Sequence, residues 1–125
     1  MPITYEVDRA SRLMVTRIGG RITPAEAFAY LDQIIADPDN EQCDELMILD
    51  DVDLSGIGAT DVRALARRAS ELTQDDQFRV AIVAPRDADF GVWRMFQTFR
   101  DLGDQRMAVF RRIEQACDWL GVKVP

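Results

Sequence analysis

Three aspartates lie close together in the segment DDVDLSGIGATD, which occupies residues 50–61. The oxygens of Asp50, Asp51 and Asp53 could converge on a divalent cation or form an aspartyl-phosphate site. Phosphoacceptor sites of that kind also use a lysine, and Lys123 is the only lysine in the chain. We therefore favour a solvated loop that follows a buried strand, where aspartate supports turns and the start of the next helix.

Ser55 and Thr60 are hydroxyl residues of the same segment that a kinase could phosphorylate. Free amides and the dipole of a helix N-terminus would stabilise a phosphate there by about 0.3–1 kcal/mol, while the neighbouring aspartates would repel it. The inward helical face begins at Val62 and needs an N-cap just before it, which favours Thr60 as that cap. We expect a capping or turn role for both hydroxyls, with a regulatory phosphosite as the alternative.

The composition excludes several common mechanisms. The chain has no histidine, so Ser-His and Cys-His pairs and histidine-containing metal sites are absent. An enzyme would have to use carboxylates and arginines, for example Asp50 or Asp51 as a general base, and no spacing specifies such a site. The net charge of -7, from 22 acidic and 15 basic residues, disfavours nucleic acid as a partner. We expect a non-catalytic protein without a metal or other cofactor.

The length of 125 residues and the hydrophobic share of 47% predict a single domain over residues 1–125. No apolar run approaches the roughly 20 residues of a membrane span, and no charged-then-apolar leader opens the sequence. Cys43 and Cys117 have no CxxC spacing, and we expect both to be reduced. These features predict a cytoplasmic location.

The apolar periodicity predicts strands and helices in the order ββαβαβαβα. The strands are expected at residues 3–8, 13–22, 45–50, 78–84 and 106–110, and the helices at 24–36, 61–72, 88–103 and 113–120, with Gly121 after the last. Thr23 should cap the first helix, with Pro24 at its first position and Glu26 completing a capping box. The first two strands should form an antiparallel hairpin in which Gly19 and Gly20 break or bulge the second. The remaining apolar strands alternate with helices, which predicts a mixed, mostly parallel sheet.

The helix predicted at 88–103, with Gly103 as its C-terminal stop, carries more apolar surface than one buried stripe requires. The apolar residues that cover about half of its circumference are Val92, Trp93, Met95, Phe96, Phe99 and Leu102, with Phe90 on the far side. Core packing, a dimer or partner face, and a groove for an apolar ligand or a membrane surface all remain open. The negative net charge argues against anionic membranes, although Arg86, Arg94 and Arg100 lie close to this helix.

The element order, the strand LMILD running into DLSGIG, and the final VFRRIEQACDWL together resemble the STAS superfamily, the sulfate transporter and anti-sigma-factor antagonist domains. Within it, the chain is most similar to the SpoIIAA-like group of small bacterial domains. The resemblance implies one α/β domain with an N-terminal β-hairpin and helices covering a mostly parallel sheet. Antagonists of this superfamily carry an Asp-Ser-Ser-Gly-type motif in which a kinase phosphorylates one serine. By motif, Ser55 takes that position with Asp53 and Gly56 beside it; counted from the end of the strand, Thr60 does.

The resemblance implies a regulatory protein-interaction module whose contact surface lies at residues 53–67. The residues expected there are Asp53, Gly56, Gly58, Asp61, Arg63 and Arg67. SpoIIAA-like proteins often lack the phosphorylatable serine, and the departure seen here argues against a working phosphoswitch. The group is also similar to the CRAL-TRIO lipid-carrier fold, which implies a lipid ligand or membrane association as the alternative. The residues expected to carry that alternative lie in the helix 89–102 and are Phe90, Trp93, Met95, Phe96 and Phe99.

Overall fold

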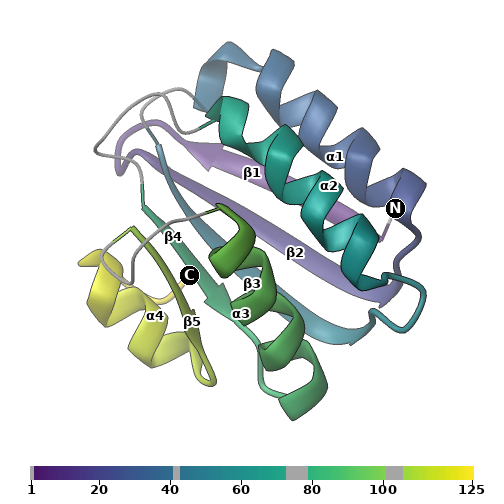
Figure 1. The fold of residues 1–125 in the computed structure, drawn as a ribbon. Helices are drawn as coiled ribbons and strands as arrows, with labels where there is room; N and C mark the ends of the chain where they lie inside the picture. Colours follow the sequence, from purple (N-terminus) through teal and green to yellow (C-terminus); the bar gives the residue numbers. More distant parts are fainter. Residues whose placement is uncertain (1, 41–42, 73–78, 101–105) are drawn as a thin grey trace.

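One five-stranded sheet organises the chain, with its strands in the order β1-β2-β3-β4-β5 (Figure 1). The computed structural model describes residues 2–40, 43–72, 79–100 and 106–125. The strands are β1 Ile3–Asp8, β2 Leu13–Arg21, β3 Asp44–Asp53, β4 Val80–Val83 and β5 Met107–Phe110; the helices are α1 Pro24–Ala36, α2 Ala59–Ala69, α3 Asp87–Arg100 and α4 Ile113–Leu120. β1 pairs with β2 in antiparallel fashion, and all other neighbouring strands are parallel. The predicted hairpin, element order and mostly parallel sheet are confirmed. The end predicted at Gly103 lies outside the described residues.

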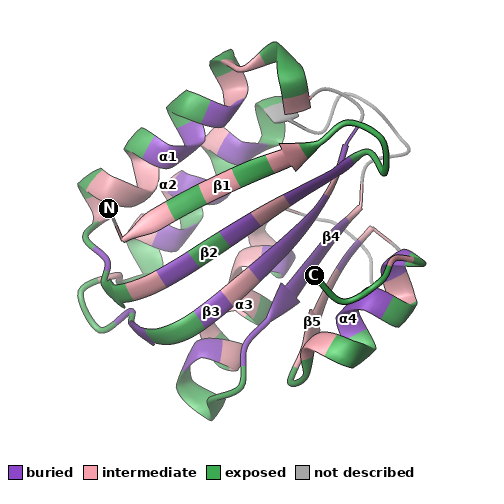
Figure 2. Ribbon diagram, turned by 180° about the vertical axis from the view of Figure 1, so that it is seen from behind, coloured by how far each residue is buried: buried purple, intermediate pink, exposed green. Residues whose placement is uncertain are grey.

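The helices form two layers of unequal size. α1, α2 and α3 cover one face of the sheet, and α4 lies alone on the other, as the view from behind shows (Figures 1 and 2). Because side chains alternate along each strand, the two faces have separate apolar clusters. Cys43 belongs to the larger cluster and Cys117 to the smaller one, and both are free and buried. No described helix has the length and apolarity needed to cross a bilayer.

Helix α1 begins as its sequence predicts. The backbone N–H of Glu26 donates to Thr23 Oγ1 at 3.2 Å, and the backbone N–H of Thr23 donates to Glu26 Oε1 at 3.0 Å. Pro24 occupies the first turn, where its missing N–H has no intrahelical partner to lose. At the other end of the chain, Gly121 follows α4 in the left-handed conformation, with φ 75°. Both predicted helix signals are confirmed.

Strand β3 is longer than its apolar run. Gly19 pairs with Asp50 and Gly20 pairs with Val52, so Asp51 is an extra residue opposite the two glycines. Gly20 and Asp51 have φ angles of 71° and 50°. The irregularity therefore lies at the two predicted glycines of β2, but its extra residue, Asp51, belongs to β3. Pairing with β2 then continues to the end of β3, past the end predicted at residue 50.

Candidate functional site

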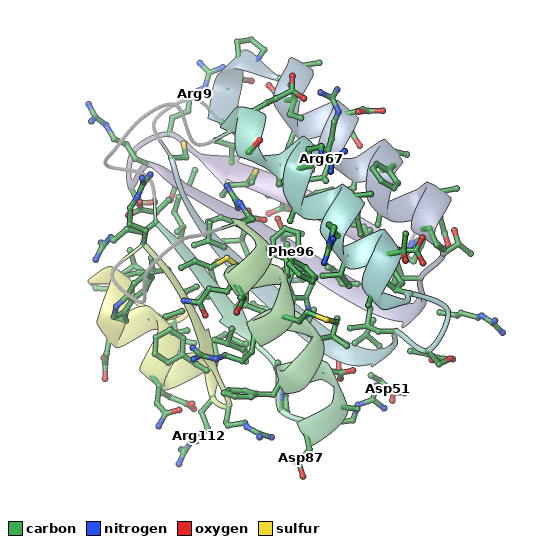
Figure 3. The ribbon with its side chains drawn as sticks, viewed as in Figure 1. Arg9, Asp51, Arg67, Asp87, Phe96 and Arg112 are labelled. Carbon is green, nitrogen blue, oxygen red and sulfur yellow. The ribbon has the colours of Figure 1, made fainter. Side chains whose placement is uncertain are left out.

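The three aspartates of the opening segment are strand residues, so the predicted loop begins only after them. Asp50, Asp51 and Asp53 lie at the exposed end of β3, beyond the part that pairs with β4. Figure 3 shows Asp51 at the same end of the molecule as Asp87. Within the described part of the chain, no group of three or more acidic or cysteine side chains is arranged to hold a metal ion.

Asp53 instead forms a turn with the following residues. Its Oδ1 accepts a hydrogen bond from the backbone N–H of Ser55 at 2.9 Å. Hydrogen bonds from Ser55 hold the pKa of the Asp53 carboxyl below its usual value, and the positive charges of Arg21 and Arg86 lower it further. Ser55 is exposed, so a kinase could reach its hydroxyl, but the adjacent carboxylate would oppose an added phosphate.

Thr60 is not the N-cap of α2, and this prediction is wrong. The helix starts at Ala59 with Gly58 as its N-cap, and Asp61 Oδ2 accepts from the backbone N–H of Gly58 at 2.9 Å. Thr60 therefore lies inside the first turn, exposed to solvent. The Asp61 carboxylate therefore binds the amide of the N-cap residue itself, and the N-cap glycine has no side chain to accept from the first turn. Neither Ser55 nor Thr60 caps the helix.

The predicted contact surface at 53–67 is continuous along the chain and mostly exposed. Asp53, Gly56 and Gly58 lie in the turn, and Arg63 and Arg67 lie on the exposed face of α2. The guanidinium of Arg63 lies over the Phe99 ring of α3, 5.0 Å from its centre, so this side chain already has an aromatic partner. Figure 3 shows Arg67 on α2.

The aromatic residues of α3 are half-buried, and none forms an exposed patch. Trp93 and Phe96 pack edge to face with their ring centres 5.3 Å apart, and the guanidinium of Arg111 lies 4.3 Å from the centre of the Phe90 ring. Phe96 lies where α2 and α3 run side by side (Figure 3). The residues predicted for an apolar ligand or membrane, all half-buried, are Phe90, Trp93, Met95, Phe96 and Phe99. Leu102 lies outside the described residues.

A cavity of about 80 Å³ lies between the sheet and the three helices that cover it. Its wall includes side chains from all five strands and from α1, α2 and α3, most of them apolar. Ile18, Leu31, Met47, Leu65, Ile82 and Phe96 are typical lining residues. Of the predicted apolar-ligand residues, Trp93 and Phe96 line this cavity. The ligand site that the structure offers therefore lies between the sheet and its covering helices rather than on the outer face of α3.

A buried polar cluster forms part of the cavity wall. Glu45 Oε2 accepts from Tyr30 Oη at 2.8 Å and from Thr16 Oγ1 at 2.9 Å, and the two hydroxyl oxygens lie 2.7 Å apart. Glu45 is only 4% exposed and Thr16 is fully buried. Burial raises the pKa of Glu45, while the hydrogen bonds from Tyr30 and Thr16 and the positive charge of Arg100 oppose that rise. Burial also raises the pKa of Tyr30 well above its ordinary value.

Two N–H donors in the same wall have no hydrogen-bond partner among the residues that the structure describes. They are Trp93 Nε1 and Arg100 Nε, and both atoms are buried. The Arg100 Nη2 group donates to the backbone oxygen of Ala69 at 3.3 Å, and the guanidinium lies 5.7 Å from the centre of the Phe96 ring. Removal from water lowers the pKa of Arg100 to about 10, so it remains positively charged at neutral pH.

The cluster of Thr16, Tyr30 and Glu45 was not among the residues predicted from the sequence. The signal was Glu45 itself, a carboxylate at the start of the apolar strand ELMILD. A charged residue in a strand covered on both faces needs buried partners. The sequence alone could not name them, because Thr16 and Tyr30 are separated from Glu45 by 29 and 15 residues.

Comparison with known proteins supports the fold. No protein-family profile and no curated protein matches the chain. Among solved structures, it is similar to an uncharacterised protein of the DUF3478 family with a SpoIIAA-like fold from Shewanella loihica. The TM-score is 0.56, with 20% identity over 94% of this chain and 93% of the other. At this identity the similarity establishes the architecture alone. The sequence resemblance is thereby confirmed at the level of the fold: the chain has a SpoIIAA-like fold.

Proposed function

We propose that this protein is a non-catalytic binding domain that holds a small apolar molecule in the cavity beneath α1, α2 and α3. The observation that carries the proposal is the cavity of about 80 Å³ with two unpartnered N–H donors, Trp93 Nε1 and Arg100 Nε, in its wall. Protein interiors are otherwise close-packed, and buried polar groups nearly always have partners. The apolar body of a ligand would fill the space, and an acceptor atom on it would give one of the two donors a partner.

The size of the cavity limits the ligand. One water needs about 10–15 Å³ of such volume, so a cavity of about 80 Å³ has room for roughly five to eight water-sized groups. Most of the wall is apolar and offers water few partners, so a short apolar molecule is the better occupant. Such a small ligand would bind with micromolar to millimolar affinity.

The surface of α3 supports the interior site over membrane association. Among the described residues, the only large apolar side chain that is exposed is Val124, at 50%. Membrane-binding surfaces present a contiguous apolar patch, and the aromatic residues of α3 are half-buried instead.

Ala27 and Ala29 provide a matched test of cavity binding. Ala27 lines the cavity and Ala29 is exposed two residues further along α1. Amide NMR spectra are recorded while 1-pentanol is added to the wild type, to Ala27→Leu and to Ala29→Leu. We expect saturable shifts at cavity residues in the wild type and in Ala29→Leu, and none in Ala27→Leu because the added leucine fills the space. Saturable binding by Ala27→Leu equal to that of the wild type, or no saturable binding by the wild type, would refute the proposal.

A regulatory interaction surface at 53–67 is the second candidate, and its exposure favours it. Arg67 is exposed on α2, and Arg112 is exposed at the N-cap of α4. A partner cross-linked in the native cell by wild type and by Arg112→Glu, and lost with Arg67→Glu, would support this candidate. Equal recovery by all three proteins would remove it.

A further inference from the structure

Among the described residues that line the cavity, Arg100 is a cation without a directly bound anion. Arg100 is half-buried with its Nε atom buried, and its only hydrogen bond within the described residues joins Nη2 to the backbone oxygen of Ala69. Glu45 influences Arg100 through charge, but no hydrogen bond joins the two side chains. Glu45 Oε2 is already occupied by the hydroxyls of Tyr30 and Thr16. Arginine and carboxylate groups frequently pair through two parallel N–H bonds, and within the described part of the chain this guanidinium has no such partner.

From this arrangement we propose that the ligand is a small monocarboxylic acid whose carboxylate binds Arg100 while Glu45 in the same cavity wall takes up a proton. This inference rests on the binding function proposed above. The unpartnered Nε–H of Arg100 would donate to the ligand carboxylate, and the apolar tail would extend along the cavity past Phe96. Trp93 precedes Arg100 by two helical turns, about 10 Å along the axis of α3 at the backbone, and we assign the head group to Arg100.

Glu45 is the group that would accept the proton, because two buried carboxylates close together cannot both remain ionised. The groups that face it are Tyr30 from α1, Thr16 from β2 and Arg100 from α3. Arg106, before β5, acts on Arg100 by repulsion. Burial already raises the pKa of Glu45, and a second negative charge would raise it further. Protonated Glu45 keeps its place in the cluster, since a carboxylic acid can both donate and accept.

Three ligands of similar size test the head group: pentanoate, 1-pentanol and pentylamine. Titration calorimetry of the wild type at neutral pH should show that pentanoate binds about tenfold or more tightly than 1-pentanol, the gain typical of a charge-assisted hydrogen bond. Pentylamine should bind more weakly than either. Repeating the pentanoate titration in phosphate and in Tris, which differ in ionisation enthalpy, should show proton uptake for pentanoate and none for 1-pentanol.

Variants then separate the inference from the function on which it rests. Arg100→Met keeps an unbranched apolar side chain and should lose the preference for pentanoate while still binding 1-pentanol. The exposed Arg17→Met on β2 is the control and should keep the preference. Glu45→Gln should still bind pentanoate, but without proton uptake. If Arg100→Met does not fold, the proton uptake of Glu45→Gln alone tests the inference.

The outcomes are distinct. If 1-pentanol occupies the cavity and pentanoate binds no more tightly, the carboxylate inference is refuted and the binding function stands. The same holds if Arg100→Met retains the preference or if wild type and Glu45→Gln take up the same number of protons. If no ligand binds the wild type, the proposed function fails and this inference fails with it.

Discussion

The buried carboxyl of Glu45 should make the protein less stable as the pH rises. Its pKa in the folded chain is raised by burial above the ordinary value of 4.5 that it has when the chain is unfolded. At pH values between these two pKa values, the folded chain binds a proton that the unfolded chain has released. The free energy of unfolding therefore falls as the pH rises. The slope reaches about 1.4 kcal/mol per pH unit at most. This loss of stability is absent at pH values below the pKa of Glu45 in the unfolded chain, and it is constant at pH values above its pKa in the folded chain.

Glu45→Gln isolates this effect, because glutamine still accepts from Tyr30 and Thr16 but cannot ionise. Urea unfolding at a series of pH values from mildly acidic to mildly alkaline gives the difference in free energy of unfolding between wild type and variant. We expect this difference to shift in favour of the variant as the pH rises. Other carboxyls, such as Asp53 with its lowered pKa, act oppositely but equally in both proteins and cancel.

An exposed glutamate supplies the control. Glu6 lies on the solvent-facing side of β1, and Glu6→Gln should follow the wild type throughout the series. A wild-type minus Glu45→Gln difference that stays constant with pH would refute the reasoning. It would mean that Glu45 stays in one protonation state over the whole range in both folded and unfolded chains.

Three further predictions follow from local contacts. Asp61→Ala should lower the free energy of unfolding by about 1 kcal/mol, because it removes the acceptor at the start of α2. Thr60→Ala should change the free energy of unfolding by less than about 0.5 kcal/mol. Urea unfolding compares the two variants, and equal losses would restore Thr60 as the cap. The pKa of Asp37 should rise in Tyr5→Phe, because the Tyr5 hydroxyl donates to the Asp37 carboxylate at 2.6 Å and lowers its pKa. Carbon NMR titration of the Asp37 carboxyl measures the shift. An unchanged titration midpoint would contradict the prediction. The stability that this lowered pKa contributes is present above the unfolded-state value and lost as the pH falls, so the variant should lose less on acidification. Gly19→Ala should cost about 1–3 kcal/mol in thermal unfolding, because its Cβ would lie 3.0 Å from a backbone oxygen of β3; a loss near zero would show that the bulge adjusts freely.

The parts of the fold that depend on local sequence were predictable. Thr23, Pro24 and Glu26 mark the start of α1 by short-range hydrogen bonding, and Gly121 marks the end of α4 by its left-handed conformation. Signals of this kind act over three or four residues and need no knowledge of the rest of the chain. The element order followed from them and from the apolar periods.

The parts that depend on pairing between strands were not predictable in detail. The apolar run of β3 indicates which residues are buried, but the strand continues through the exposed Asp53 because β2 still pairs with it. The N-cap was misplaced for a related reason. Thr60 has the better capping side chain, but Asp61 can reach back to Gly58, so the helix starts two residues earlier than a capping threonine would allow.

The polar cluster at the cavity wall was the part of the site that the sequence predicted least. Thr16, Tyr30 and Glu45 are each unremarkable in their own elements, and only the sheet register and the packing of α1 bring their oxygens within hydrogen-bonding distance. Trp93 and Phe96 were predicted as apolar-ligand residues from the width of the apolar face of α3. Their position in the wall of the cavity depends on how α2 and α3 pack.

The strand order has a consequence for how the chain folds. Every strand lies beside the one that precedes it in the sequence, so each pairing closes only one hairpin or one helical crossover. The entropy lost in each closure is then that of a short segment, and no strand must wait for a partner from a distant part of the chain. We expect the sheet to assemble progressively from the β1–β2 hairpin, so that on the ribosome each newly synthesised strand can add to an edge that already exists.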